Sequence, residues 1–191
     1  MTTRLSFAAT ALLTLCGAAR AQNGYFDFGQ IPGLDAEPTV QIDLNPMMLG
    51  WVTQAAKQDD PEAAKAIASL KGVRVLVYEN IDASVKAVSQ FIADASRKLE
   101  GDGWQRTVYV HDGDDNVRIY MKPGDPKAPK AEIAGFVVMV VDDSDAVFIN
   151  VAGPLDPEQL GRLTGGLGWG GMLNGFIGGS RNHDEERDHD R

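Results

Sequence analysis

The spacing of apolar residues changes along the chain and predicts two different kinds of structure. Apolar and polar residues alternate from Thr39 to Leu44, which predicts a strand with one buried face. Helices are then predicted over residues 47–57 and 61–70, each introduced by a capping residue and a proline. Residues 73–78 are apolar at almost every position, as expected of a central strand that is covered on both faces.

The longest and clearest helical pattern runs from about residue 84 to 100. Its apolar residues recur at helical spacing and include Val85, Val88, Phe91, Ile92, Ala95 and Leu99. Gly101 and Gly103 end it. In the shorter helix over residues 47–57, the apolar residues Met48, Trp51, Val52 and Ala55 share one side.

Beyond residue 103 the spacing changes to every second residue, which predicts strands. These cover residues 104–110, 116–121, 133–141 and 146–152, with aspartate-rich turns after the first and the third, and a short helix is expected over 156–163. The element order β-α-α-β-α-β-β-β-β-α predicts an α+β fold. We expect a mixed or antiparallel sheet that has a four-strand C-terminal meander and helices packed on one face.

The first 21 residues have the pattern of a secretory signal peptide. Arg4 precedes an apolar run, from Leu5 to Ala19, that is too short to span a membrane, and Ala19-Arg20-Ala21 is an A-x-A cleavage site. A buried N-terminal helix does not account for that site. A lipid-attachment site at Cys16 is an alternative, but the residue before it is the large Leu15. The sequence therefore predicts export and cleavage after Ala21, to the periplasm or the extracellular medium.

The mature chain divides into three parts. Residues 22–38 are polar and turn-rich and predict an exposed lead-in, although Tyr25, Phe26 and Phe28 either pack on the domain surface or form a short recognition segment. Residues 39–163 form the single α+β domain. We expect residues 164–191 to comprise a glycine-rich segment and a charged, disordered tail.

Charge and cysteine content exclude several classes of function. The chain has 18 basic and 27 acidic residues and a net charge of −9. Loss of Arg4 and Arg20 with the signal peptide leaves 16 basic residues and a charge of −11. This balance argues against nucleic-acid binding and against electrostatic docking on anionic lipid. The one cysteine, Cys16, excludes a disulfide framework and a thiolate zinc cluster.

An ordered set of short motifs resembles a known family. The segments in question are LKGVRVLVY at 70–78, Gly103-Trp104, VRIY at 117–120, GFVVMV at 135–140 and VFINVAG at 147–153. In this order they resemble the bacterial domain-of-unknown-function 4252 family, over roughly Asp43 to Leu163. Members are mostly small exported or envelope proteins, so the resemblance implies an exported α+β domain. The family supplies no established activity or catalytic residues.

The histidines are the first candidates for chemistry, because imidazole is a common general base and metal ligand. Only His111 lies in the predicted domain, beside Asp112, Asp114 and Asp115, and a metal-assisted hydrolase centred on this turn is one hypothesis. A solvated hairpin tip is the simpler interpretation, since no calcium-loop pattern follows. His183 and His189 lie in the charged tail. No G-x-S-x-G nucleophile motif is present.

The glycine-rich segment is the least usual stretch of the sequence. Residues 166–171 match G-x-G-x-x-G, but they follow a helix rather than a strand, so we expect no dinucleotide cofactor. Leu163 to Ser180 contains eight glycines and no charge. It is a flexible linker, a segment that packs on the domain or self-associates, or a membrane contact. Membrane contact is the least favoured of these.

These observations favour an exported, non-catalytic binding or envelope-associated domain. We expect no catalytic residue, no cofactor and no resident metal. The partner is expected to be an unidentified protein or small molecule and not nucleic acid. The alternatives are a hydrolase that uses His111, Asp112 and Asp114, and a membrane-associated protein that uses residues 163–180.

Overall fold

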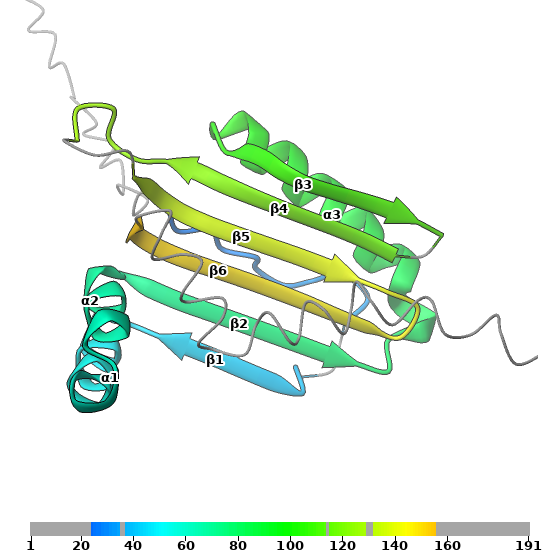
Figure 1. The fold of residues 1–191 in the computed structure, drawn as a ribbon. Helices are drawn as coiled ribbons and strands as arrows, with labels where there is room; N and C mark the ends of the chain where they lie inside the picture. The colour runs from blue at the N-terminus through cyan, green and yellow to red at the C-terminus, as the bar shows by residue number, and fades with distance from the viewer. Residues whose placement is uncertain (1–23, 35–36, 114, 129–131, 156–191) are drawn as a thin grey trace, which may run out of the picture.

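Six antiparallel strands form one open sheet, which confirms the α+β class (Figure 1). The computed structural model describes residues 24–34, 37–113, 115–128 and 132–155. The elements in chain order are β1 (Val40–Leu44), α1 (Pro46–Asp59), α2 (Pro61–Ser69), β2 (Gly72–Glu79), a 3-10 turn (Asp82–Ser84), α3 (Val85–Gly101), β3 (Gln105–Asp112), β4 (Asp115–Pro123), β5 (Ile133–Val141) and β6 (Asp145–Leu155).

The strand order in the sheet is β1-β2-β6-β5-β4-β3. Neighbours from β3 to β6 are also neighbours in sequence, so each pair is joined by a local connection, the longest being residues 124–132 between β4 and β5. The pairing of β2 with β6 then attaches the N-terminal strands, with Val75 opposite Ile149. This long-range pairing leaves β1 and β3 as the two edge strands and places β5 and β6 among the interior strands.

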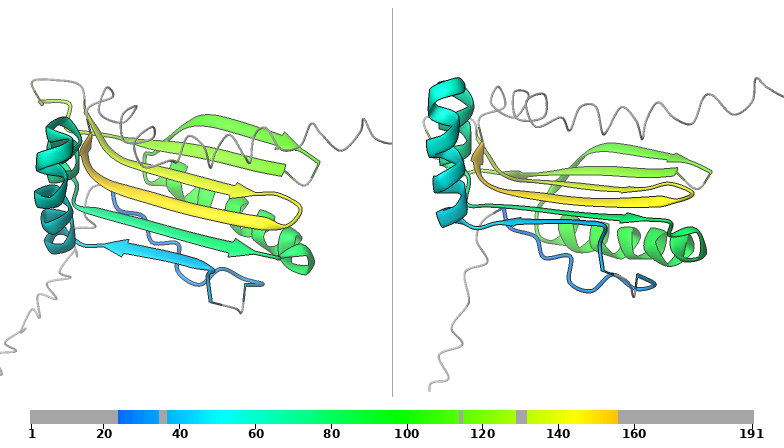
Figure 2. Two further views of the ribbon diagram at one scale, coloured as in Figure 1. Left: turned by 60° about the horizontal axis from the view of Figure 1, so that its bottom comes forward. Right: turned by 90° about the horizontal axis from the view of Figure 1, so that it is seen from below.

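Helix α3 covers one face of the sheet, which we call the α3 face (Figure 2). The buried side of the helix consists of Val85, Val88, Ile92, Ala95, Ser96 and Leu99. They pack with Tyr120, Val137, Met139 and Phe148 from the strands beneath. Except for Phe91, which is partly buried, the apolar residues predicted for this helix face are the ones that it buries.

The lead-in is part of the core, contrary to the expectation that residues 22–38 are exposed. Phe26, Phe28 and Ile31 are buried on the α3 face. The Phe28 ring packs against Phe148 with 5.4 Å between centroids. These three side chains complete the apolar cluster that α3 forms with the sheet on this face. Of the two alternatives for the aromatic residues, the structure shows packing for Phe26 and Phe28, whereas Tyr25 is exposed.

Helices α1 and α2 form a hairpin at one end of the sheet rather than lying on the α3 face (Figure 2). Its buried apolar residues, among them Leu49, Ala66 and Ile67, join a second cluster on the opposite face. The expectation of helices on one face therefore holds for α3 alone. The reason is the connection: β1 and β2 are adjacent antiparallel strands, so the hairpin between them remains at the end where they join it.

The apolar side of α1 is turned outward. Trp51 is 65% exposed and Met47 61%, whereas the buried residues of this helix are Leu49 and Thr53. The pattern of Met48, Trp51, Val52 and Ala55 thus identified the helix but not its buried side. A helix that packs only against the end of a sheet buries a narrow part of its surface. Which side chains lie in that part depends on the angle at which the helix crosses the strand ends.

Several predicted segments lie outside the described residues. These are the signal peptide (1–21), the helix over 156–163 and the glycine-rich segment and tail (164–191). Among the residues that are described, no helix is long and apolar enough to cross a membrane.

Candidate functional site

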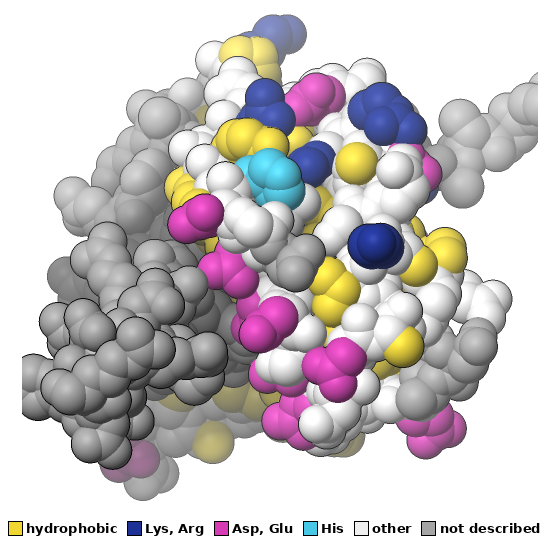
Figure 3. Space-filling model, turned by 90° about the vertical axis from the view of Figure 1, so that its right-hand side faces the viewer, with side chains coloured by type: hydrophobic (Ala, Val, Ile, Leu, Met, Phe, Trp, Pro, Cys, Tyr) yellow, Lys and Arg dark blue, Asp and Glu magenta, His cyan; other side chains and the backbone are white. Residues whose placement is uncertain are grey.

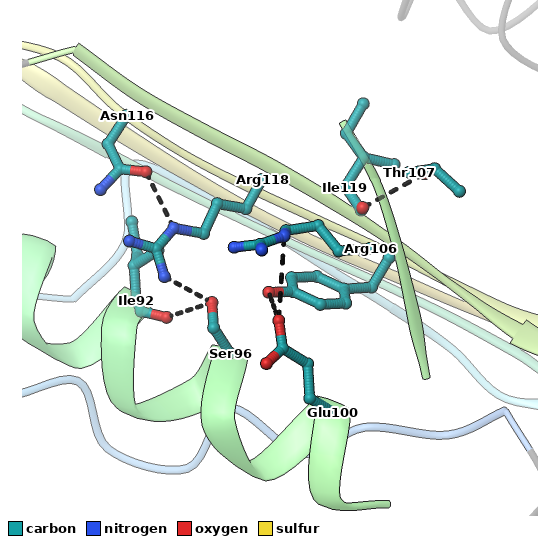
Figure 4. Close-up of polar contacts among 9 residues, drawn as sticks. Ile92, Ser96, Glu100, Arg106, Thr107, Asn116, Arg118 and Ile119 are labelled. Carbon is teal, nitrogen blue, oxygen red and sulfur yellow. Dashed lines mark hydrogen bonds and ion pairs between the residues drawn. The ribbon is translucent and has the colours of Figure 1, made fainter. Parts of the chain in front are cut away.

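A row of polar side chains lies between α3 and the strands β3 and β4 (Figure 4). Alternation along β4 places Asn116, Arg118 and Tyr120 toward α3 and the intervening apolar residues on the other face. The neighbouring β3 contributes Arg106 and Tyr109, which pair in register with Tyr120 and Arg118. Polar side chains thereby gather along the β3–β4 margin of this face, while Arg74, Asp43 and Asn150 lie on the same face toward β1.

Arg106 has a carboxylate partner in this row. Its Nε lies 3.8 Å from Oε1 of Glu100, on the last turn of α3. The same Oε1 accepts a hydrogen bond of 3.1 Å from the Tyr120 hydroxyl. Burial raises the pKa of Tyr120, and Glu100 raises it further against a lowering effect of Ser96, so the hydroxyl remains a donor at neutral pH.

Among the described residues, Arg118 has only neutral partners. Its Nε donates to Oδ1 of Asn116 at 3.1 Å, and its Nη1 donates to Oγ of Ser96 at 2.8 Å. Ser96 in turn donates to the Ile92 carbonyl at 2.7 Å, which fixes the hydroxyl as an acceptor toward the arginine. The guanidinium also lies against the Tyr109 ring, 5.3 Å from its centroid. These contacts hold the half-buried cation in one orientation without neutralising it.

A pocket of about 330 Å³ opens beside Arg118, between the start of α3 and the tip of the β3–β4 hairpin. Figure 3 looks toward this end of the molecule, where basic side chains and the histidine lie near one another. The lining residues are Val85, Lys86, Ser89, Gln90, His111, Gly113, Asn116 and Arg118. The pocket is larger than those of about 170 and 200 Å³ that the lead-in forms with β2 and with α3.

The described residues that line the pocket are rich in hydrogen-bond donors and include no carboxylate. Lys86 and Arg118 carry positive charge, and His111, Ser89 and Gln90 add side chains that can donate. Within the described part of the chain, Nη2 of Arg118 has no hydrogen-bond partner, because the bonds of this side chain use Nε and Nη1. In an acidic protein such a lining is suited to an anion.

His111 lies in this pocket, but it is not brought together with a set of metal ligands. The residue is exposed on β3, where its ring stacks on Tyr109 at 6.4 Å between centroids. Asp112 and Asp115 are paired in the hairpin register, and Asp114 lies outside the described residues. Where residues are described, no group of three His, Cys, Asp or Glu side chains is arranged to hold a metal ion.

The sequence alone did not point to Arg118, Lys86 or Ser96. Arg118 was visible only as a polar residue in an alternating strand, and Ser96 as a serine on the predicted helix. Ser96 and Arg118 are 22 residues apart in sequence, and they meet only because α3 lies across β4. A signal was nonetheless present, since an arginine on the inward side of a strand requires partners.

The resemblance suggested by the sequence motifs is confirmed. A search of curated proteins found no match to this chain. A comparison with protein families matched residues 34–163, which includes β1 to β6, α3 and the pocket residues. The chain belongs to the family described as Domain of unknown function (DUF4252).

Proposed function

We propose that the protein is a non-catalytic binding domain that takes up a small anionic ligand in the pocket between α3 and the β3–β4 hairpin. The observation that carries this proposal is the state of Arg118. Its guanidinium is half-buried and held by Asn116, Ser96 and the Tyr109 ring, yet none of these partners is negatively charged. The other arginine of the row, Arg106, has Glu100 as its counterion.

A fixed cation that has no counterion among the described residues favours an anionic ligand for a physical reason. Part of the solvation of Arg118 is lost on folding, and neutral hydrogen bonds replace only some of it. A carboxylate or phosphate oxygen that accepts from Nη2 restores the missing interaction, and Lys86 supplies a second positive charge in the same lining. The volume of about 330 Å³ matches the lower range of small-molecule sites.

The ligand class is therefore a small molecule bearing a carboxylate or phosphate group. Arginine recognises both groups through paired N–H donors, whereas lysine acts as a point charge. We probe the two classes with citrate and with inorganic phosphate, since each presents several oxygens in a volume that the pocket accommodates. Isothermal titration of the purified full chain at low ionic strength measures both. We expect saturable binding of at least one probe, weakening as salt is added.

Matched variants separate a specific site from general charge effects. Arg118→Gln should abolish saturable binding, and Lys86→Gln should weaken it about tenfold or more. Lys65→Gln, on the exposed surface of α2, makes the same change in net charge far from the pocket and should leave binding unchanged. Absence of saturable binding of both probes, or equal losses in all three variants, contradicts the proposal.

Export belongs to the proposal as well. Residues 1–21 support it, because they combine a basic residue, a short apolar run and an A-x-A site. Mass spectrometry of the N-terminus of protein recovered from the host envelope and medium tests it. We expect a chain that begins at Gln22, and an intact Met1 in the cytoplasmic fraction alone contradicts export.

No observation on the described residues favours the hydrolase hypothesis, whose Asp114 is not described. A separate activity assay with a phosphate ester and a carboxylate ester tests it, since turnover that is lost in His111→Ala contradicts a purely binding role.

A further inference from the structure

The sheet face opposite α3 presents apolar side chains on all six strands. We call it the second face. The antiparallel registers place the following side chains side by side on it: Val40, Ile42 and Leu44 of β1; Val73, Val75 and Val77 of β2; Val147, Ile149 and Val151 of β6; Phe136, Val138 and Val140 of β5; Val117, Ile119 and Met121 of β4; Val108 and Val110 of β3. The charged residues in the same alternation follow this set at one end, where Glu79 pairs with Asp145 and Asp112 with Asp115, so the apolar part of the face requires a cover.

Burial on this face falls from the middle strands to the edges. Val138, Val140, Val147 and Ile149, on the middle strands, are at most 2% exposed. Val108, Val110, Val40 and Ile42, on the edge strands, are 37–42% exposed. The covered zone therefore spans β4 to β2, three strand spacings or about 14 Å. That is close to the width of a single helix with its side chains, about 10–12 Å.

The described helices cover only one end of this buried zone. The α1–α2 hairpin stands at the end of the sheet where β2 begins and β6 finishes (Figure 2). Val151 lies at that end, whereas Val147 is four residues earlier on β6, about 13 Å farther along the strand. Val147 and its neighbour Val140 are nevertheless buried. Helix α3 packs on the opposite face and does not reach them.

The chain itself supplies a segment of matching chemistry. Residues 163–180 carry no charge and include Leu167, Trp169, Met172, Leu173, Phe176 and Ile177. This 18-residue run would extend about 27 Å as a helix. Strand β6, one of the middle strands of the second face, ends at Leu155, only eight residues before the run begins. Such a short connection gives the segment a high effective concentration at this face.

We propose that residues 163–180 dock on the second face of their own sheet and cover the middle strands from β4 to β2. The eight glycines then have a packing role, because residues without a side chain let a backbone approach a flat layer of valines closely. The occupant is the same chain rather than a second copy, since a copy docking by its own second face would bury the edge strands as fully as the middle ones.

Photo-crosslinking within the full chain tests this docking. A benzoylphenylalanine at position 119, on the second face of β4, should crosslink within one chain to peptides from residues 163–180. The matched control is position 109, which is on β3 and faces the α3 side, and it should give no crosslink to that segment. Mixing isotopically light and heavy chains identifies crosslinks between molecules.

Crosslinks from position 119 that join two chains, or that miss residues 163–180, overturn the proposal. A second test uses substitutions outside the described residues, so it leaves the described sheet and helices unchanged in sequence. Leu173→Asp places a charge in the segment and should raise the fluorescence of an apolar dye severalfold by releasing the cover. Asn182→Asp adds the same charge beyond the segment and should have no such effect. Equal dye binding in the two variants also overturns the proposal.

Discussion

Asn150 of β6 binds the backbone of the lead-in on both sides of Tyr25. Its Oδ1 accepts from the Phe26 amide at 3.0 Å, and its Nδ2 donates to the Gly24 carbonyl at 3.1 Å and to the Phe136 carbonyl at 3.2 Å. The side chain is 1% exposed, so these partners replace water entirely. An irregular segment is thereby fastened to the middle of the sheet.

Replacing Asn150 should therefore free the lead-in as well as lower stability. Asn150→Ala leaves the Phe26 amide and two carbonyls without this partner, and we expect the free energy of unfolding to fall by about 2 kcal/mol or more. Hydrogen exchange of the Phe26 amide should accelerate in the same variant. Gln54→Ala, on the exposed side of α1, should change stability by less than about 0.5 kcal/mol. Full protection of Phe26 in Asn150→Ala would show that the rings alone hold the segment.

The backbones of Gly24 and Gly135 are in close contact, so a methyl group at position 135 should be destabilising. A Cβ at that position would lie 2.4 Å from the Gly24 Cα, which forces the lead-in away from β5. We expect Gly135→Ala to lower the denaturation midpoint. Gly50→Ala is the matched control, since a Cβ there meets nothing within 4 Å and the residue lies inside α1. It should stabilise the protein by about 0.5–1 kcal/mol. An unchanged denaturation midpoint in Gly135→Ala contradicts the close contact.

Trp51 provides a test of which side of α1 is buried, with the buried Trp104 as the reference. Trp104 is 6% exposed on the α3 face, and Trp104→Ala should cost about 3–5 kcal/mol of unfolding free energy. Trp51 is 65% exposed, and Trp51→Ala should cost less than about 1 kcal/mol. Urea denaturation followed by circular dichroism measures both without relying on tryptophan fluorescence. A loss at Trp51 comparable to that at Trp104 would mean that the outer side of α1 is packed.

The turn before β6 should make stability depend on pH in mildly acidic solution. Burial raises the pKa of Asp145 above its ordinary 3.8; the Asn80 amide opposes this, while the Asp142 and Glu79 charges add to it. A raised pKa means that the folded state binds the proton more tightly than the unfolded state. The associated stabilisation is complete below pH 3.8 and is lost as pH rises through the folded-state pKa of Asp145.

Asp145→Asn removes this dependence while keeping an acceptor for the Asn80 amide, 3.4 Å away. Relative to the wild type, the variant should therefore gain stability as the pH is raised from 3 to 7, as followed by the thermal midpoint. Asp143→Asn, at an exposed position of the same turn, makes an equal charge change and should track the wild type more closely. If the thermal midpoints of the two variants change with pH in parallel, Asp145 is not the cause of the pH dependence.

Within the described residues, the local pattern of the sequence was sufficient to predict the helices and strands themselves. The apolar run at Ile133–Val141 predicted β5 with its observed bounds, and the spacing from Val85 to Leu99 identified α3 and most of its buried side. These predictions succeed because strand and helix periodicities are properties of a single segment and its solvent. The turns likewise follow from their local residues, and the α+β class follows from the order of the predicted segments.

Which surfaces meet was decided only by the tertiary structure. The pairing of β2 with β6 sets the sheet order, and the position of α3 over β4 joins Ser96 to Arg118 and opens the pocket. Burial of Phe26 and exposure of Trp51 follow from that arrangement, and neither can be read from the adjacent residues. The physical reason is that side-chain burial and charge compensation depend on the elements brought against a residue, and those elements lie far away in the sequence.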